Sequence, residues 1–115
     1  MLSESLRNKL LEFRAERDWE KFHNLRTLSA SIVLESAELL ELTQWTPDIE
    51  LERVANEKLA RIKHEVADLA ILITYLAHDL KIDLEKSVSE KLAINAKKYP
   101  VDKARGSSLK YDEFQ

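Results

Sequence analysis

The sequence of 115 residues contains no cysteine, one glycine and two prolines. The absence of cysteine excludes disulfide bonds, thiolate zinc sites and a cysteine nucleophile. A single glycine also excludes a P-loop or a G-x-G-x-x-G phosphate-binding loop. Because glycine and proline punctuate turns, their scarcity favours a few long helices over a sheet of many short strands.

Long apolar runs are absent too. No segment approaches the roughly 20 apolar residues of a membrane span, and the first residues, MLSESLRNKLLEF, contain no signal-peptide core. The net charge of −3 argues against a protein that coats nucleic-acid polymers. We therefore expect a cytoplasmic protein that binds neither membranes nor nucleic-acid polymers.

Hydrophobic residues make up 44% of the chain, which is enough to build a core. A domain of this size still leaves much apolar surface near water, so we also expect self-association. Apolar residues recur at helical spacing in four segments, which run from about Ser3 to Arg17, Leu25 to Trp45, Asp48 to Leu80 and Leu84 to Tyr99.

Local signals set the expected ends of these helices. Ser3 and Asp83 are typical N-caps, and Thr46-Pro47 predicts a cap followed by the first residue of the third helix. A kink or break is expected near Asn56. These segments predict an all-α four-helix bundle over residues 1–100, and residues 101–115 form an extended tail of the same domain.

Four carboxylates intrude on or border the apolar stripes of the second and third helices. Glu35 and Glu38 share one helix face because residues three apart are neighbours, and Glu65 and Asp68 repeat the spacing. Facing pairs of acids repel each other in a low-dielectric core, and a bound divalent cation removes that cost. Oxygen ligands suit a hard ion, so the pattern indicates Mg²⁺, with Mn²⁺ as a possible substitute. Ordinary surface acids are the alternative.

A di-iron carboxylate site is the competing metal hypothesis. It requires two E-x-x-H motifs, whereas the chain offers only Glu20 to His23, in the aperiodic connection Asp18–Asn24. His64 and His78 have no partner at ligand spacing, so we interpret them as solvated helix residues.

Aromatic and polar side chains suggest what accompanies the acids. Trp45 lies seven residues after Glu38 on the same helix face, and Trp19 and His23 crowd the connection before the second helix. Flat side chains near a metal site stack on nucleobases, although tryptophans also serve as core residues. Asn95 continues an apolar stripe and either reads a base or is a satisfied core asparagine.

Several motifs resemble one family. E-S-A-E at 35–38 and E-V-A-D at 65–68 resemble the E-x-x-E…E-x-x-D signature of the MazG-like all-α nucleoside triphosphate pyrophosphohydrolases. The match is closer to their dCTP pyrophosphatase branch, through F-x-x-x-R-D-W-x-x-F-H at 13–23, E-L-x-x-x-x-Q-W at 38–45, I-N-x-x-K-Y-P-V at 94–101 and R-G-S-x-x-K-Y at 105–111. The chain departs from the family pattern at Leu25–Leu28, Ala37 and Leu72, which affects base preference more than the chemistry.

The resemblance implies a homodimer or a dimer-of-dimers homotetramer whose subunits share each site. It implies Mg²⁺-dependent hydrolysis of a nucleoside triphosphate, such as dCTP or a modified pyrimidine form, to the monophosphate and pyrophosphate, in nucleotide-pool sanitising. Carried over by position, the metal ligands are Glu35, Glu38, Glu65 and Asp68. The nucleotide pocket contains Trp19, His23, Trp45 and Asn95, and the residues that face the phosphates are Lys91, Lys98, Tyr99, Arg105, Lys110 and Tyr111.

In the expected mechanism, Glu38 and Glu35 are catalytic, and Glu38 orients or deprotonates the water that attacks the α-phosphorus. Two alternatives stay open. One is a non-catalytic helical interaction module, in which both tryptophans belong to the core. The other is a relative in the same superfamily that acts on dUTP or phosphoribosyl-ATP.

Overall fold

The computed structural model describes residues 2–114, and this range contains helices and no strand, as the all-α prediction requires. Two compact units divide it, residues 2–81 and residues 82–114. Among residues 2–114, every helix falls short of the length or the hydropathy that a bilayer span requires. In chain order the elements are α1 (Glu4–Glu16), η1 (Glu20–Phe22), α2 (Leu25–Glu41), η2 (Asp48–Glu50), α3 (Leu51–Glu57), α4 (Leu59–Asp79), α5 (Leu84–Lys98), α6 (Val101–Ala104) and η3 (Tyr111–Glu113).

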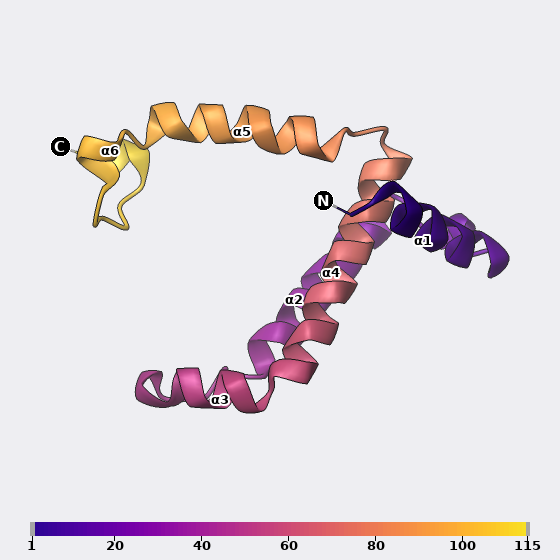
Figure 1. Ribbon diagram of the computed structural model, residues 1–115, viewed down its shortest axis with the longest axis horizontal. Helices are drawn as coiled ribbons and strands as arrows, with labels where there is room; N and C mark the ends of the chain where they lie inside the picture. The colour runs from indigo at the N-terminus through magenta and orange to yellow at the C-terminus, as the bar shows by residue number, and fades with distance from the viewer. Residues whose placement is uncertain (1, 115) are drawn as a thin grey trace. The chain divides into compact units, whose positions relative to one another are not determined.

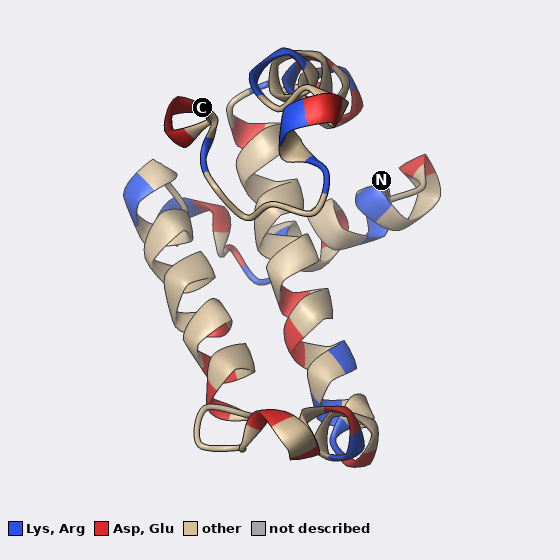
Figure 2. Cartoon of the chain, turned by 90° about the vertical axis from the view of Figure 1, so that its left-hand side faces the viewer, with Lys and Arg blue, Asp and Glu red and all other residues tan. Residues whose placement is uncertain are grey.

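The first unit is organised around one pair of helices, α2 and α4, which pack along each other (Figures 1 and 2). The shorter helices α1 and α3 contact opposite ends of α4 (Figure 1). Buried apolar residues include Leu28 on α2 and Tyr75 and Ala77 on α4, with Leu42 just beyond the end of α2. The first unit is therefore a pair of long helices with a shorter helix packed at each end. It does not form a four-helix bundle by itself.

The end of α2 lies four residues earlier than predicted, at Glu41 and not Trp45. The Leu42 and Thr43 amides donate to carbonyls three residues back, which tightens the last turn. The Nζ of Lys58 donates to the Leu42 carbonyl at 2.6 Å, which satisfies an acceptor that the helix leaves open. A lysine distant in sequence thus helps to end the helix.

The third predicted helix is two helices. α3 ends at Glu57 and α4 begins at Leu59, so the kink or break expected near Asn56 is a break at Lys58. The predicted cap is also shifted, because Pro47 has an extended conformation with ψ 145° and precedes the helical turn that begins at Asp48.

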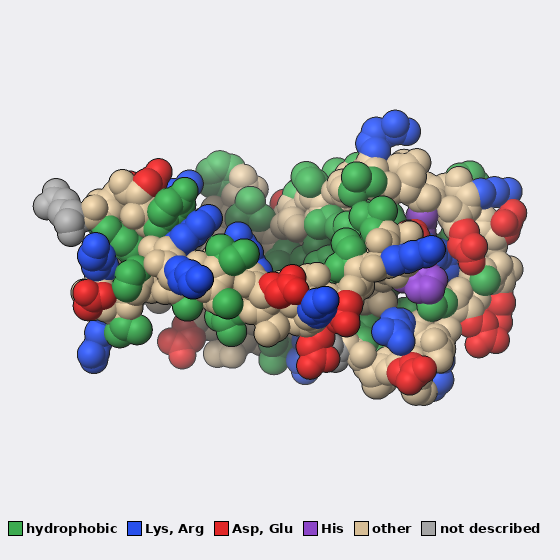
Figure 3. All heavy atoms as spheres, turned by 90° about the horizontal axis from the view of Figure 1, so that it is seen from above, with side chains coloured by type: hydrophobic (Ala, Val, Ile, Leu, Met, Phe, Trp, Pro, Cys, Tyr) green, Lys and Arg blue, Asp and Glu red, His purple; other side chains and the backbone are tan. Residues whose placement is uncertain are grey.

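Large apolar side chains remain exposed on the helix pair. Val33, Leu34 and Leu40 of α2 and Val66 of α4 each keep more than half of their surface exposed. Hydrophobic side chains lie open on the face shown in Figure 3. The apolar fraction of the sequence thus exceeds what this unit buries by itself.

In the second unit, Asp83 caps α5 as predicted, because its carboxylate accepts the Lys86 amide at 3.0 Å. The tail is not extended throughout, because it contains the short helix α6 and the turn η3. The ring of Tyr99 packs edge-on against Tyr111 and Phe114, with centroids 6.3 and 5.8 Å apart. These aromatic contacts fold the tail back onto the end of α5.

Candidate metal and nucleotide site

The packing of α2 against α4 brings three of the four predicted acids together. One carboxylate oxygen from each of Glu35, Glu38 and Glu65 lies within 4.8 Å of the others. Acidic segments of the two helices lie in the half of the pair nearer to α3 (Figure 2). Within residues 2–114, neither Asp68 nor any histidine belongs to this cluster. We call Glu35, Glu38 and Glu65 the acid cluster.

Two members of the acid cluster point inward. Glu35 and Glu65 are half-buried, and the Oε2 atom of each is buried without a hydrogen-bond partner. An unpaired buried polar atom costs about 1–3 kcal/mol, and more when it is charged. Since two ionised carboxylates cannot donate to each other, a proton or a cation must stand between them. Glu38 is exposed.

The pKa of Glu35 is raised by the same unfavourable proximity of two carboxyl groups. A proton shared with the Glu65 carboxyl raises the pKa of Glu35 to about 7, and burial and the charges of Glu38 and Asp68 act in the same direction. Asp68 is exposed, yet it lies near enough to act on Glu35. A divalent cation would supply the positive charge that the proton supplies in its absence.

The donor set fits a hard divalent cation. All its ligand atoms are carboxylate oxygens, which Mg²⁺ and Mn²⁺ prefer and which softer metals do not. His64 and His78 are exposed, as predicted. The described residues therefore contain a candidate divalent-cation site made by one helix from each side of the pair.

The connection between α1 and α2 positions the predicted residues Trp19 and His23. Asp18 has a φ of 54°, the Trp19 amide donates to the Arg14 carbonyl at 3.1 Å, and the Asp18 amide donates to the Ala15 carbonyl at 3.0 Å. This pattern is a Schellman cap, which reverses the chain after α1. Trp19 then packs edge-on against Phe13 with a centroid distance of 5.7 Å and stays 43% exposed.

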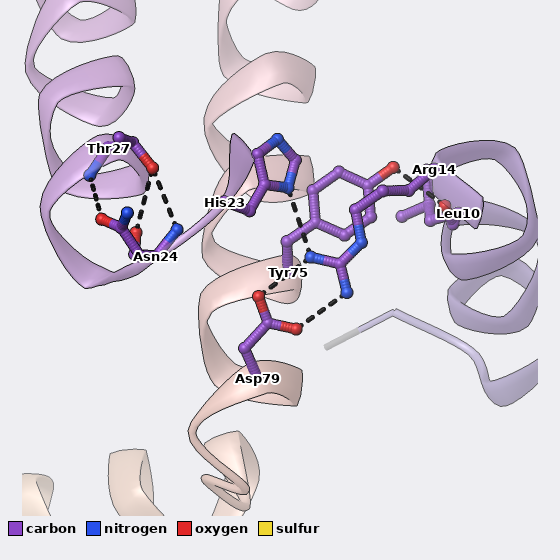
Figure 4. Close-up of polar contacts among 7 residues, drawn as sticks. All are labelled: Leu10, Arg14, His23, Asn24, Thr27, Tyr75 and Asp79. Carbon is purple, nitrogen blue, oxygen red and sulfur yellow. Dashed lines mark hydrogen bonds and ion pairs between the residues drawn. The ribbon is translucent and has the colours of Figure 1, made fainter. Parts of the chain in front are cut away.

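His23 lies against α4 and not in open solvent. Its Nδ1 is 3.2 Å from a guanidinium nitrogen of Arg14, and its ring centroid is 5.5 Å from that of Tyr75 (Figure 4). Burial and the Arg14 charge lower the pKa of His23, and the Asp79 carboxylate opposes them. The lowered pKa favours the neutral imidazole of His23.

A model of the MazG-like family matches residues 30–114. The chain belongs to this family. It is 39% identical to dCTP pyrophosphatase 1 of Bos taurus over 113 residues, which cover 96% of this chain and 67% of the relative. The Homo sapiens protein of the same name is 40% identical over 113 residues, which cover 96% of this chain and 66% of the relative. This MazG-like chain thus spans about two thirds of the length of these relatives.

A solved structure of a pyrophosphatase from Archaeoglobus fulgidus has the same fold. It superposes with a TM-score of 0.82 at 37% identity, over 84% of this chain and 91% of that chain. The resemblance inferred from the motifs is therefore confirmed, and the relatives support the class of enzyme that it implies.

The nucleotide residues expected in the first unit do not meet at the acid cluster. Leu25 begins α2, and Glu35 lies ten residues further, about 15 Å along the helix axis. Trp19 and His23 precede α2 and therefore lie near its N-terminal end, away from the acid cluster. Trp45 is 88% exposed in the turn after α2, so the prediction that it shares a helix face with Glu38 is wrong. The helix α2 ends at Glu41, four residues before Trp45.

The remaining predicted residues lie in the second unit. Asn95 is exposed on α5, so the alternative of a core asparagine is not supported within this unit. The Lys98 ammonium lies 4.7 Å from the centroid of the Tyr111 ring, and Tyr99 adjoins the same ring. Three further cationic residues are exposed: Lys91, Arg105 and Lys110.

The charged residues that hold His23 are not among the predicted site residues. Arg14 is 3% exposed and forms two hydrogen bonds with Asp79, and Tyr75 donates to the Leu10 carbonyl at 2.8 Å (Figure 4). A signal was present, because Arg14 follows Leu10 by one helical turn and Asp79 follows Leu76 by three residues. Opposite charges that continue two apolar stripes indicate a buried pair.

Proposed function

We propose that this MazG-like chain is an Mg²⁺-dependent pyrophosphohydrolase that converts a deoxynucleoside triphosphate to the monophosphate and pyrophosphate. The preferred substrate is dCTP or a modified pyrimidine deoxynucleotide, in keeping with the named activity of its relatives. The acid cluster is the observation that carries the proposal, because two of its buried oxygens lack a partner. The role is to remove unwanted nucleotides from the cytoplasmic pool.

The burial of each acid suggests its part in the reaction. Glu35 and Glu65 each have a buried oxygen without a partner and serve as ligands, with the exposed Asp68 as the fourth acid. Glu38 is the exposed member, so its carboxylate is free to orient or deprotonate the attacking water, with Glu35 beside it. The cation, when bound, supplies positive charge that stabilises the phosphoryl group under attack.

The uncovered apolar surface supports an oligomer. Two α2–α4 pairs that faced each other would bury side chains such as Leu34 and Val66 and would complete a four-helix bundle. We propose a homodimer or a dimer-of-dimers tetramer in which another subunit contributes to each nucleotide pocket. Sedimentation equilibrium tests this assembly, and a stable monomer would contradict it.

The activity is tested by pyrophosphate release from a panel of dCTP, 5-methyl-dCTP, dUTP, dTTP and phosphoribosyl-ATP. Turnover is expected with Mg²⁺ or Mn²⁺, none with EDTA, and the highest kcat/KM with a cytosine nucleotide. Preference for dUTP or phosphoribosyl-ATP would favour the other branch of the superfamily. If no pyrophosphate is released from any nucleotide, the proposed enzymatic activity is wrong, and the non-catalytic interaction module is favoured.

A matched pair of variants tests the site. Glu38→Gln is expected to lower kcat by about a hundredfold or more, because it removes the group that handles water. Glu41→Gln is the control, since Glu41 is exposed on the same helix and lies outside the acid cluster. Equal activity of the two variants, with unchanged helical circular dichroism, would show that Glu38 has been assigned the wrong role.

A further inference from the structure

The ends of α1 and α4 are joined by a partly buried ion pair. The guanidinium nitrogens of Arg14 donate to both carboxylate oxygens of Asp79, at 2.9 and 2.8 Å (Figure 4). The Arg14 side chain is 4% exposed and the Asp79 side chain is 30% exposed. The guanidinium also lies over the Tyr75 ring, 4.6 Å from its centroid.

Stability alone does not explain why an ion pair joins these two helices. The Nε of Arg14 is buried without a hydrogen-bond partner, which adds to the cost of desolvating the charge. Apolar side chains of similar size often join two helices as well as a buried ion pair does. The other contacts of Arg14 therefore suggest why this position carries a guanidinium.

The third contact of the guanidinium is His23. Its Nη1 lies 3.2 Å from the His23 Nδ1 and also donates to Asp79. Arginine stays protonated and is only a donor, so the Nδ1 must be the acceptor. A neutral imidazole that accepts at Nδ1 carries its proton on Nε2. The ion pair thus selects one of the two neutral tautomers.

The selected tautomer leaves a donor available. Within residues 2–114 the structure gives the Nε2 of His23 no hydrogen-bond partner, and this atom is not buried. In Figure 4 it points away from Arg14. The same arginine also holds the backbone, because its carbonyl accepts the Trp19 amide at 3.1 Å.

We propose that Arg14 and Asp79 are positioning residues that hold His23 in its Nε2–H tautomer and present that N–H to an acceptor atom of the nucleotide. This inference rests on the proposed function for the identity of the ligand. Asp79 orients the guanidinium with two hydrogen bonds, and the guanidinium orients the imidazole. Tyr75 packs against both the guanidinium and the imidazole.

The tautomer is measured directly in the wild-type protein by ¹⁵N NMR of the histidine rings at pH 7, assigned with a His23→Gln variant. The expected spectrum has a protonated Nε2 and an unprotonated Nδ1. An Nδ1–H tautomer or an imidazolium at this pH would overturn the proposal. This measurement needs neither activity nor an Arg14 variant that folds.

Kinetics test the link to the nucleotide. Arg14→Met is expected to raise KM for the best substrate about tenfold with little change in kcat, because one positioned hydrogen bond is lost. The acid limb of kcat/KM should move to higher pH, because His23 would then face Asp79 and the neutral Tyr75 without the Arg14 charge. In a His23→Gln background, Arg14→Met should have no further effect on KM.

Two further variants separate positioning from simple stability. Arg14→Lys keeps the charge but cannot hold three acceptors in one plane, so it should not restore KM. Asp79→Asn keeps one acceptor and should raise KM less than Arg14→Met. Arg53→Gln breaks an exposed ion pair with Glu57 on α3 and should leave KM unchanged.

The outcomes distinguish this inference from the proposed function. An active enzyme whose KM, pH profile and tautomer are unchanged by Arg14→Met would overturn the positioning role. Full rescue of KM by Arg14→Lys would do the same. A wild-type protein that hydrolyses no nucleotide would overturn the proposed function instead, and the NMR spectrum would still decide the tautomer.

Discussion

Replacing Glu35 by glutamine should stabilise the metal-free protein and at the same time strongly reduce the stability that it gains from Mg²⁺. Glu35 and Glu65 each have a buried carboxylate oxygen without a partner. The amide introduced by Glu35→Gln supplies an N–H donor to the Glu65 carboxylate and removes one of two negative charges. Satisfying such an atom contributes about 1–3 kcal/mol to the free energy of unfolding, which sets the expected gain above about pH 8.

The sign of the pH dependence follows from the raised pKa of Glu35. Its pKa is about 7 in the folded protein and 4.5 ordinarily, so the folded state binds more protons between these values. The stability that the shared proton contributes is fully present below pH 4.5 and is lost as the pH rises through about 7. Glu35→Gln removes this dependence, so the advantage of the variant should appear only at high pH.

The assay is urea unfolding at about pH 5 and about pH 8.5, with EDTA or with saturating Mg²⁺. Wild-type protein should gain stability from Mg²⁺ at the higher pH, because the ion binds the folded state, and Glu35→Gln should gain much less. Glu41→Gln is the control and should behave as wild type. Two results would refute the role given to Glu35: a Glu35→Gln variant that is less stable than wild type at the higher pH in EDTA, or one that keeps the full gain from Mg²⁺.

Three other predictions concern stability. Asp79→Asn should lower the free energy of unfolding by about 2 kcal/mol at pH 7, because it weakens a partly buried pair with Arg14. Since Arg14 lowers the pKa of Asp79, this loss should disappear as the pH falls through that lowered pKa, and acid titration of unfolding measures it. Lys81→Gly should raise the free energy of unfolding by about 1 kcal/mol in thermal unfolding, because Lys81 has a φ of 55° that glycine adopts without strain. Asn24→Ala should cost about 1 kcal/mol in the same assay, since Asn24 forms a capping box at the start of α2, and an unchanged midpoint would contradict that role.

Local sequence signals predicted local structure well. Ser3 and Asp83 cap their helices as expected, because a side-chain acceptor satisfies open amides within the same few residues. The spacing of Glu35 and Glu38 placed both on one face of α2 for a similar reason. Where the controlling partner was distant, prediction failed: Lys58 satisfies the Leu42 carbonyl sixteen residues earlier in the chain, and α2 ends before Trp45.

Periodicity, capping and motif spacing are properties of neighbouring residues, so the amino-acid sequence was enough to predict an all-α MazG-like chain with two acidic pairs at helical spacing. Which carboxylates converge could be seen only in the folded protein, since the proximity of Glu35 to Glu65 depends on how α2 packs along α4. The folded protein also shows that Arg14 pairs with Asp79, 65 residues away, and that His23 accepts from that arginine. Burial and charge compensation are settled by packing between distant elements, so no local pattern contains them.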